Sequence, residues 1–279
     1  MIILINTVIQ SDNLSLLRKL EDNYVDLIYS DILYNTGKKF KDFDDDLGTE
    51  EEAMEWYRPR LIEMHRILKD TGTIYLHCDY RLVHYLKVEM DKIFGVNNFR
   101  NEIIWHYNSA PRKKNDFGKR HDTILRYSKT DDYTFNDEEV RIPYSETAPR
   151  GYEKEKYYNP LGKVMGDVWD VKILGQNDKT ERTGYSTQKP KDLIEIIIKS
   201  SSNPGDLVAD FFAGSGTTGV VAKEWGRNYL MCDINKKAIE ISNERLSKTI
   251  RGVKLNANQE NSVNLVEADE FNLFNIVKK

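Results

Sequence analysis

The sequence predicts an α/β protein with a doubly wound parallel sheet and one inserted segment. Apolar, β-branched strands alternate with amphipathic helical stretches over residues 1–95, and the same alternation returns from about residue 190. A glycine-rich turn lies between a strand and a helix in the second half. Between residues 101 and 182 the helical periodicity is lost, which is typical of an insert or a second domain.

Length and composition indicate a soluble, cytoplasmic protein. A chain of 279 residues with 39% hydrophobic residues can bury one good core and carry a smaller second unit. Its apolar runs are well short of a membrane span, and the start "MIILINTVIQ" does not resemble a signal peptide. Cys78 and Cys232 are too far apart for a C-x-x-C site, and the five histidines show no ligand spacing. We therefore expect no metal site and no membrane partner.

The first elements form a βαβ unit. A strand over roughly residues 2–9 leads to a helix over "NLSLLRKL", with Asp12 or Asn13 placed to cap it. The next strand, residues 25–30, is an apolar run in "YVDLIYSDILYNTG" that ends near Asp31.

Three further elements continue the alternation. Helical spacing of apolar residues predicts a helix over residues 51–68, interrupted at Pro59. "GTIYLHC" (residues 72–78) is a predicted strand, and "YRLVHYLKVEMDKIFG" is its helix, ended by Gly95. The middle region then shows only the short predicted strands "NEIIWHYN", "DTILRYS" and "YTFN".

The strongest local signal is the stretch "VADFFAGSGTTGVVAKEWGRNYLMCDI". It holds a G-x-G-x-x-G pattern at Gly214, Gly216 and Gly219, and Asp233 ends the strand that follows. Glycines permit a sharp turn, the helix N-terminus offers free N–H groups, and a carboxylate at the next strand end can accept hydrogen bonds from a ribose diol. This pattern indicates a nucleoside cofactor, and it does not separate NAD from S-adenosylmethionine.

The place of this pattern in the chain is informative. Too few elements follow it to complete a doubly wound sheet, so the missing strands must come from residues 1–95. The strands ending at Asp31 and at Asp210 then share one sheet. Ligands bind outside the carboxyl ends of such strands, so we expect Asp31 and Tyr34 at the mouth of the cofactor site.

Several motifs together resemble one family. "NTVIQSDNL", "VDLIYSDILYNTG", "LKDTGTIYLHCD", "ERTGYSTQKP" and the glycine-rich stretch are similar, in order, to motifs of the permuted group of DNA amino-methyltransferases often called β. The resemblance covers most of the chain and implies a Rossmann-like methyltransferase sheet that transfers a methyl group from S-adenosylmethionine to adenine N6 or cytosine N4. The family has two prolines in its catalytic loop, whereas Ile32 and Leu33 stand at these positions here.

The resemblance also implies catalytic roles for the opening stretch. Asp31 and the backbone carbonyl of Ile32 would each accept one hydrogen of the target amine, and Tyr34 would stack on the flipped-out base. An acid at position 31 resembles the adenine-specific members, which favours adenine N6. Three alternatives remain: N4-cytosine methylation, a DNA-binding protein that has lost turnover, and a nucleotide-dependent oxidoreductase.

Cofactor contacts follow from the same resemblance. Thr187 and Lys189 would hold the methionine carboxylate, and Asp12 resembles the acid that reaches the adenine ring, although it can equally be a helix cap. The amino-acid and ribose ends of the cofactor are assigned to these residues: Asp210, Phe212, Gly214, Gly216 and Asp233.

DNA contacts are expected in the basic segment "PRKKNDFGKRH". Lys113, Lys114, Lys119 and Arg120 would contact phosphates of double-stranded DNA, although the net charge of the chain is −4. The predicted organisation is a catalytic half (1–105), a target-recognition insert (106–182), a cofactor-binding half (183–250) and a C-terminal tail (251–279). A homodimer and a cognate restriction endonuclease are further candidate partners.

Overall fold

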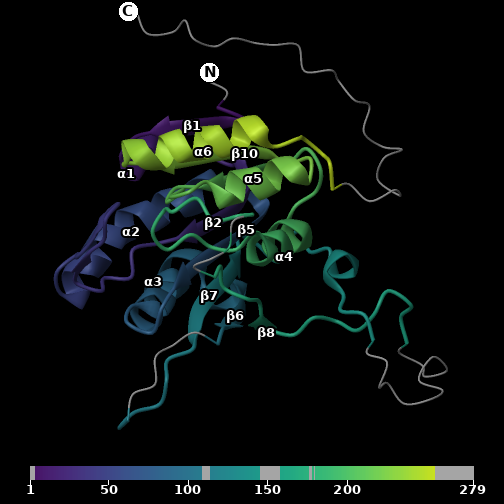
Figure 1. The fold of residues 1–279 in the computed structure, drawn as a ribbon, viewed down its shortest axis with the longest axis horizontal. Coiled ribbons are helices and arrows are strands. Elements are labelled where there is room, and N and C mark those ends of the chain that lie inside the picture. The colour runs from purple at the N-terminus through teal and green to yellow at the C-terminus, as the bar shows by residue number, and fades with distance from the viewer. Residues whose placement is uncertain (1–3, 109–113, 145–157, 176–177, 179, 255–279) are drawn as a thin grey trace, which may run out of the picture.

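A computed structural model describes residues 4–108, 114–144, 158–175, 178 and 180–254. Its centre is an eight-stranded sheet in the order β1-β10-β9-β2-β5-β7-β6-β8 (Figure 1). The strands are β1 (Thr7–Gln10), β2 (Val25–Asp31), β5 (Leu68–Cys78), β6 (Phe99–His106), β7 (His121–Ser128), β8 (Val168–Asp170), β9 (Leu207–Asp210) and β10 (Asn228–Asp233). The predicted α/β class is confirmed.

Five neighbouring strands of this sheet are parallel. β1, β10, β9, β2 and β5 run in one direction, β7 is antiparallel to both β5 and β6, and β8 is parallel to β6. The strand that leads into the glycine-rich turn therefore lies next to the strand that opens the catalytic stretch, because β9 pairs with β2 through Leu27 and Ile28. The carboxyl ends of β2, β9 and β10 meet at one edge, as the sequence predicts.

Helices cover both faces of the sheet. One apolar cluster joins strand residues to α1 (Asn13–Leu17), α2 (Glu50–Ile67) and α3 (Val83–Phe94), and a second joins the opposite strand face to α4 (Lys191–Ser201), α5 (Thr217–Glu224) and α6 (Lys236–Lys248). Strand β2 shows why the sheet is doubly wound. Ile28 belongs to the first cluster, while Leu27 and Tyr29 belong to the second. Each such buried apolar side chain contributes about 1.5–3 kcal/mol.

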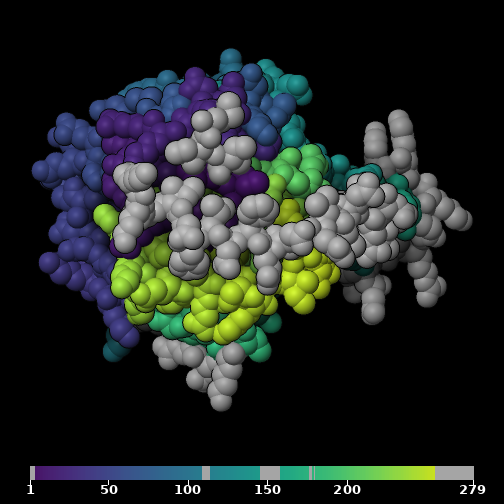
Figure 2. Space-filling view, turned by 90° about the horizontal axis from the view of Figure 1, so that it is seen from above, coloured from purple at the N-terminus to yellow at the C-terminus, as the bar shows by residue number. Residues whose placement is uncertain are grey.

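The beginning and the end of the described fold lie side by side. β1 pairs with β10 and α6 packs on β1. Figure 2 shows this edge, where the purple N-terminal residues border the yellow-green residues of α6. Within the described residues, no helix is long and apolar enough to cross a membrane.

Several element boundaries differ from the sequence-based expectation. Helix α2 continues through Pro59 instead of stopping there, because Tyr57, Leu61 and Met64 pack into one core on both sides of the proline. This packing outweighs a local cost of about 3 kcal/mol. β5 begins at Leu68 and not at residue 72. "YTFN", residues 133–136, is not a strand, and β1 is shorter than the predicted strand.

The middle region contributes to the central sheet. β7 lies between β5 and β6, and β8 forms the edge beside β6, so residues 121–128 and 168–170 belong to the same sheet as the catalytic stretch. The smaller elements are the pair β3 (Lys38–Lys39) and β4 (Asp44–Asp45) and the 3-10 helices η1 (Val96–Asn98) and η2 (Asp137–Val140). Figure 1 shows η2 and the segment after it extending away from the sheet. The role of residues 106–182 in target recognition stays a prediction.

Candidate active site

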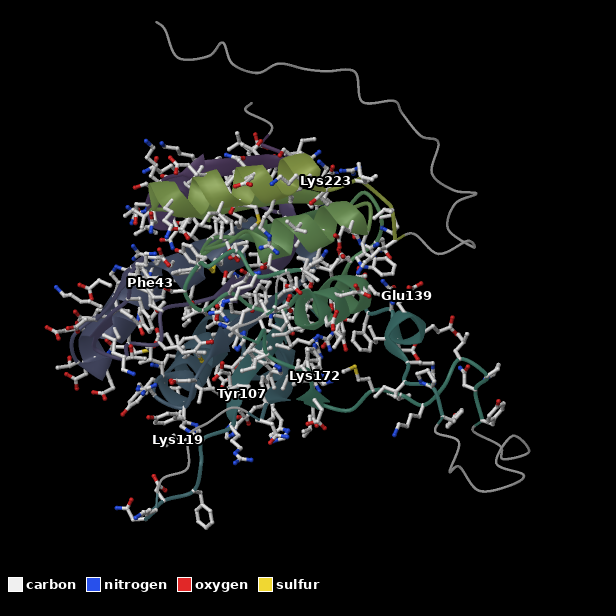
Figure 3. The ribbon with its side chains drawn as sticks, in the orientation of Figure 1. Phe43, Tyr107, Lys119, Glu139, Lys172 and Lys223 are labelled. Atoms are coloured by element: carbon white, nitrogen blue, oxygen red, sulfur yellow. The ribbon has the colours of Figure 1, made fainter. Side chains whose placement is uncertain are left out.

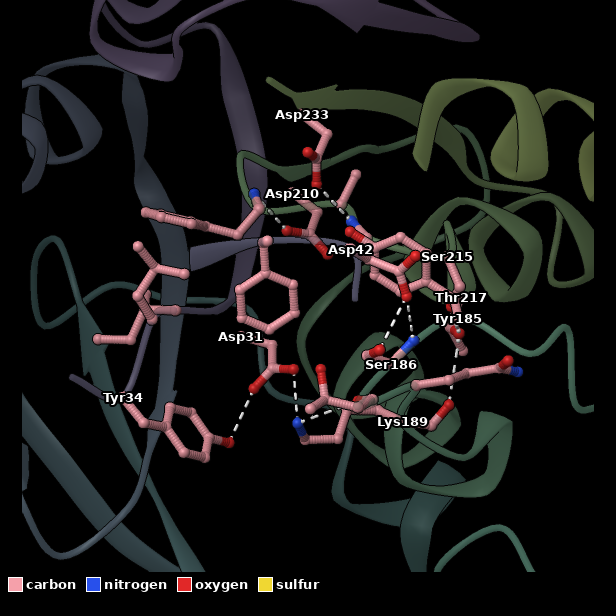
Figure 4. Close-up of a pocket in the computed structure, with 18 of the residues that line it drawn as sticks. Asp31, Tyr34, Asp42, Tyr185, Ser186, Lys189, Asp210, Ser215, Thr217 and Asp233 are labelled. Atoms are coloured by element: carbon pink, nitrogen blue, oxygen red, sulfur yellow. Dashed lines mark hydrogen bonds and ion pairs between the residues drawn. The ribbon is translucent and has the colours of Figure 1, made fainter. Parts of the chain in front are cut away.

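One cavity of about 770 Å³ opens at the carboxyl ends of β2, β9 and β10 (Figure 4). It brings together most of the predicted site residues from five segments of the chain. The predicted residues that line it are Asp12, Asp31, Ile32, Tyr34, Thr187, Lys189, Asp210, Phe212, Gly214 and Asp233. Gly216 lies directly beside this lining, between Ser215 and Thr217.

The glycine-rich turn has the backbone geometry that its sequence predicts. Gly214 and Gly216 have φ of +50° and +75°, in the left-handed region that favours glycine. A Cβ at Gly216 would also lie 2.5 Å from the Ser242 hydroxyl of α6. Gly216 is the N-cap of α5, and Thr217 and Thr218 of its first turn line the cavity. The first turn of α5, whose N–H groups lack intrahelical partners, therefore borders the space that a ligand would occupy.

Hydrogen bonds hold two strand-end carboxylates in the part of the cavity beside the glycine-rich turn, which we call the cofactor end. Asp210 accepts hydrogen bonds from the Phe212 N–H at 2.9 Å and the Thr218 hydroxyl at 2.6 Å, and Asp233 accepts from the Gly214 N–H at 2.8 Å. Burial raises the pKa of Asp210 to about 7 and also raises that of Asp233. A ligand that brings positive charge or hydrogen-bond donors would therefore stabilise the ionised form of both carboxylates.

Asp12 caps a helix and also faces the cavity. Its Oδ2 accepts from the Ser15 N–H at 2.8 Å, which confirms the predicted cap of α1, and its Oδ1 pairs with Arg60 at 3.0 Å. Burial acts to raise its pKa, but the hydrogen bonds of Ser15 and the charge of Arg60 outweigh burial and lower it. Contact between Asp12 and an adenine ring stays a prediction.

The segment before α4 closes one side of the cavity. Thr187 has φ of +60°, and Ser186 donates both its N–H and its hydroxyl to Asp42 at 2.8 Å. Asp42 also pairs with Lys237 of α6 at 2.6 Å. Asp42 therefore binds both the segment before α4 and helix α6, which belong to the predicted cofactor half.

The predicted catalytic acid lies at the end of β2, where side chains hold it. Asp31 Oδ1 accepts from the Tyr34 hydroxyl at 2.8 Å, and its Oδ2 pairs with Lys189 at 2.5 Å (Figure 4). Lys189 is thus engaged by Asp31, a pairing that the sequence did not predict. We call the part of the cavity around Asp31 the amine end. Lys189 lines the same cavity and lies between this part and the cofactor end.

The Ile-Leu pair after Asp31 uses its backbone polar groups. The Ile32 N–H donates to the His77 carbonyl at 3.2 Å, and the Leu33 carbonyl accepts from the Tyr57 hydroxyl at 2.7 Å. The loop is therefore fixed by hydrogen bonds, one of which a proline at position 32 would not make.

Three polar side chains close to Asp31 were not predicted as site residues: His77, Tyr107 and Asp122. Fully buried His77 lies with Nδ1 3.8 Å from Asp31 and Nε2 3.5 Å from Asp122, and the Tyr29 hydroxyl is 2.8 Å from Nδ1. Tyr107 donates to Asp122 at 2.9 Å. For His77 and Asp122 the available signal was a polar residue in an otherwise apolar strand, in "GTIYLHC" and "HDTILRYS". Tyr107 had no comparable signal.

The described part of the basic segment, residues 114–121, does not line the cavity. Lys113 is outside the described residues, Lys114 and Lys119 are exposed, and Arg120 is half-buried and donates to Asn108. Lys119 Nζ lies 3.7 Å from the ring centre of Tyr80, which follows β5. Figure 3 shows Lys119 where this segment projects from the body of the protein.

Comparison with known proteins identifies the class to which this fold and cavity belong. A family model described as DNA methylase (N6_N4_Mtase) matches residues 25–244. The Type II methyltransferase M.HpaI of Haemophilus parainfluenzae is 34% identical over 247 residues, which covers 87% of this chain and 74% of the relative. The DNA adenine methyltransferase YhdJ of Escherichia coli is 33% identical over 254 residues, covering 86% and 82%.

Solved structures support the same fold. The PvuII DNA methyltransferase, described as cytosine-N4-specific, aligns with a TM-score of 0.65 at 18% identity over 86% of this chain and 85% of that one. A putative DNA modification methylase of Thermus thermophilus, complexed with S-adenosyl-L-methionine, aligns with a TM-score of 0.60 at 20% identity over 88% and 95%. The chain belongs to the N6/N4 DNA methylase family.

Proposed function

We propose that this DNA methyltransferase transfers the methyl group to N6 of adenine in double-stranded DNA, and that it belongs to the permuted β group. The observation that carries the proposal is the position of Asp31. Its carboxylate lines the same cavity as Asp210 and Asp233, at the end of a strand that pairs with the glycine-turn strand β9.

The methyl donor is S-adenosylmethionine, and the cavity fits its chemistry. This cofactor carries an ammonium group and a ribose diol, and it supplies a sulfonium methyl group when bound. Asp210 and Asp233 offer acceptors to such donors, and the turn at Gly214 permits close approach. Lys189 pairs with Asp31 at 2.5 Å, and its remaining N–H donors make it the proposed partner of the methionine carboxylate.

The amine end can prepare a weak nucleophile. The lone pair of an exocyclic amine is delocalised into its base, and acceptors for its two hydrogens would draw the nitrogen toward tetrahedral geometry. Asp31 and the Ile32 carbonyl are the proposed acceptors, and the Tyr34 ring is the proposed stacking face for a flipped-out base. An acid at this position and the relative YhdJ, named as an adenine methyltransferase, both support adenine.

DNA would approach the open side of the cavity. We propose that Lys113, Lys114, Lys119 and Arg120 contact phosphates, which is supported by the exposure of Lys114 and Lys119 and by the position of Lys119 over Tyr80 near the cavity wall. The Type II relatives support a role in restriction–modification, with a cognate restriction endonuclease as a partner. A homodimer stays a prediction.

The deciding experiment identifies the methylated base. The protein is incubated with mixed genomic DNA and S-adenosylmethionine that carries a labelled methyl group, and the DNA is digested to nucleosides. We expect label in N6-methyl-2′-deoxyadenosine alone. Label confined to N4-methylcytosine would make the choice of adenine wrong. Cofactor binding without transfer to any DNA would instead favour a DNA-binding protein without turnover.

A further inference from the structure

A second buried carboxylate lies beside the proposed catalytic acid. Asp122, on β7, is 8% exposed, and the Tyr34 hydroxyl is 3.4 Å from its Oδ2 while donating to Asp31 at 2.8 Å. One hydroxyl group therefore bridges two carboxylates that come from strands two places apart in the sheet. His77 of β5 lies between them and contacts both.

The protonation states suit a transfer between these carboxylates. Burial acts to raise the pKa of Asp122, but His77 and Lys189 outweigh burial and lower it, so Asp122 is ionised and can accept a proton. Burial and the charges of Asp31 and Asp122 raise the pKa of Tyr34. Tyr34 is therefore a neutral phenol, which can donate one proton while it accepts another.

The proposed reaction releases one proton per turnover. As the amine nitrogen bonds to the methyl carbon, the carbon–sulfur bond breaks and its electron pair stays on sulfur, so the nitrogen becomes positively charged. Its proton passes to Asp31, the nearest acceptor. Asp31, which pairs with Lys189 at 2.5 Å, must lose that proton before it can accept another in the next turnover.

We propose that Asp122 takes this proton from Asp31 through the Tyr34 hydroxyl, and this inference rests on the proposed methyl transfer. Tyr34 accepts the proton from Asp31 and gives its own to Asp122, so Asp31 returns to a carboxylate and Tyr34 stays a phenol. The half-buried Tyr107, which donates to the other oxygen of Asp122, offers the way to solvent. His77 is a positioning residue. The titratable and charged groups that face Asp122 are Tyr29, Asp31, Tyr34, His77, Cys78, Asp79, Tyr107 and Lys189.

Two independent variants test the relay. Asp122→Asn removes the second acceptor, and Tyr34→Phe keeps the aromatic ring but removes the bridging hydroxyl. The matched control is Tyr127→Phe, which removes a tyrosine–aspartate hydrogen bond of 2.7 Å to Asp91 on the other side of the sheet. Each protein is given DNA and labelled S-adenosylmethionine in excess over enzyme, and the first turnover and the steady-state rate are both followed from pH 6 to pH 9, with and without imidazole as a small base.

We expect both variants to slow steady-state methyl transfer by about 100-fold, the lower end of what positioned proton transfer contributes, while the first turnover stays near the wild-type rate. Added imidazole should restore part of the rate, because it can take the proton from Asp31 directly. Cofactor affinity and the control should stay near wild type. A merely structural role would lower thermal stability without any response to imidazole, and that result would overturn the relay. So would wild-type rates in both variants.

The outcome also separates the two proposals. If the wild-type protein transfers methyl groups and both variants do so at the same rate, the relay is wrong but the proposed function stands. Wild-type protein that transfers no methyl group to any DNA would overturn the proposed function and the relay with it.

Discussion

At the cofactor end of the cavity, backbone N–H groups from nearby residues help to hold Asp210 and Asp233, whereas at the amine end Asp31 is held by side chains. Phe212 follows Asp210 by two positions, but Lys189 meets Asp31 from 158 residues away. The Asp210 contact lies within one turn of chain and the Asp233 contact joins two adjacent strands, whereas Lys189 meets Asp31 only when the whole sheet is assembled. Substitutions at the amine end should therefore change chemistry most, and substitutions at the cofactor end should change binding.

The largest effect is expected from Asp31→Ala. Loss of the carboxylate removes the proposed acceptor of the amine, and we expect methyl transfer to fall by about 10²–10⁴-fold while cofactor affinity stays close to wild type. Single-turnover transfer with pre-bound DNA and labelled cofactor measures the loss, and equilibrium titration measures the affinity.

The matched control lies at the other end of the same strand. Asp26 also pairs with a lysine, Lys69, at 2.8 Å, so Asp26→Ala removes an equivalent ion pair far from the cavity. It should lower stability but leave the transfer rate of the folded protein unchanged. Full activity in Asp31→Ala would mean that Asp31 has no catalytic role.

Asp233→Ala should affect the other end of the cavity. It removes the proposed acceptor of the ribose diol and the bond to the Gly214 N–H. A charge-assisted hydrogen bond is worth about 1.5–3 kcal/mol, so we expect S-adenosylmethionine to bind about 10–150-fold more weakly, with little change in DNA affinity. Titration calorimetry with the cofactor checks this, and equal affinities would remove Asp233 from the binding site.

The same contrast explains which features the sequence could predict. Local patterns predicted β2, β9, β10 and the glycine turn, because strand propensity and positive φ are properties of short stretches. They could not predict that His77 and Asp122 meet Asp31, since that depends on β5 and β7 following β2 in the sheet. They also missed the continuity of α2 through Pro59, where core packing decides.

Asp210 should make stability depend on pH. Its folded pKa of about 7 lies above the unfolded value near 3.8, so its stabilising contribution is complete below pH 4 and is lost as the pH rises through 7. Asp210→Asn carries no charge to bury. Relative to wild type, the variant should therefore gain about 2 kcal/mol of unfolding free energy between pH 5.5 and pH 8.5.

Urea unfolding of both proteins without cofactor measures this difference at the two pH values. Asp26→Asn is a suitable control because Asp26 is paired with Lys69 at the opposite end of the sheet. A difference between wild type and Asp210→Asn that does not change with pH would show that the Asp210 carboxylate is not desolvated.

The smallest effect concerns the Ile-Leu pair that replaces the two prolines of the resembling family. Proline at position 32 cannot donate to the His77 carbonyl, and that lost bond should cost about 1 kcal/mol, or about 2–4 °C in Tm. Leu33→Pro keeps this bond and also keeps the carbonyl that Tyr57 binds, so it should cost less. Thermal unfolding of the two single variants measures the order. If Ile32→Pro were the more stable of the two, a fixed φ would stabilise the loop more than the hydrogen bond to His77 of β5 does. The stiffer loop would still present the residue 32 carbonyl, so the variant should then also transfer methyl groups faster.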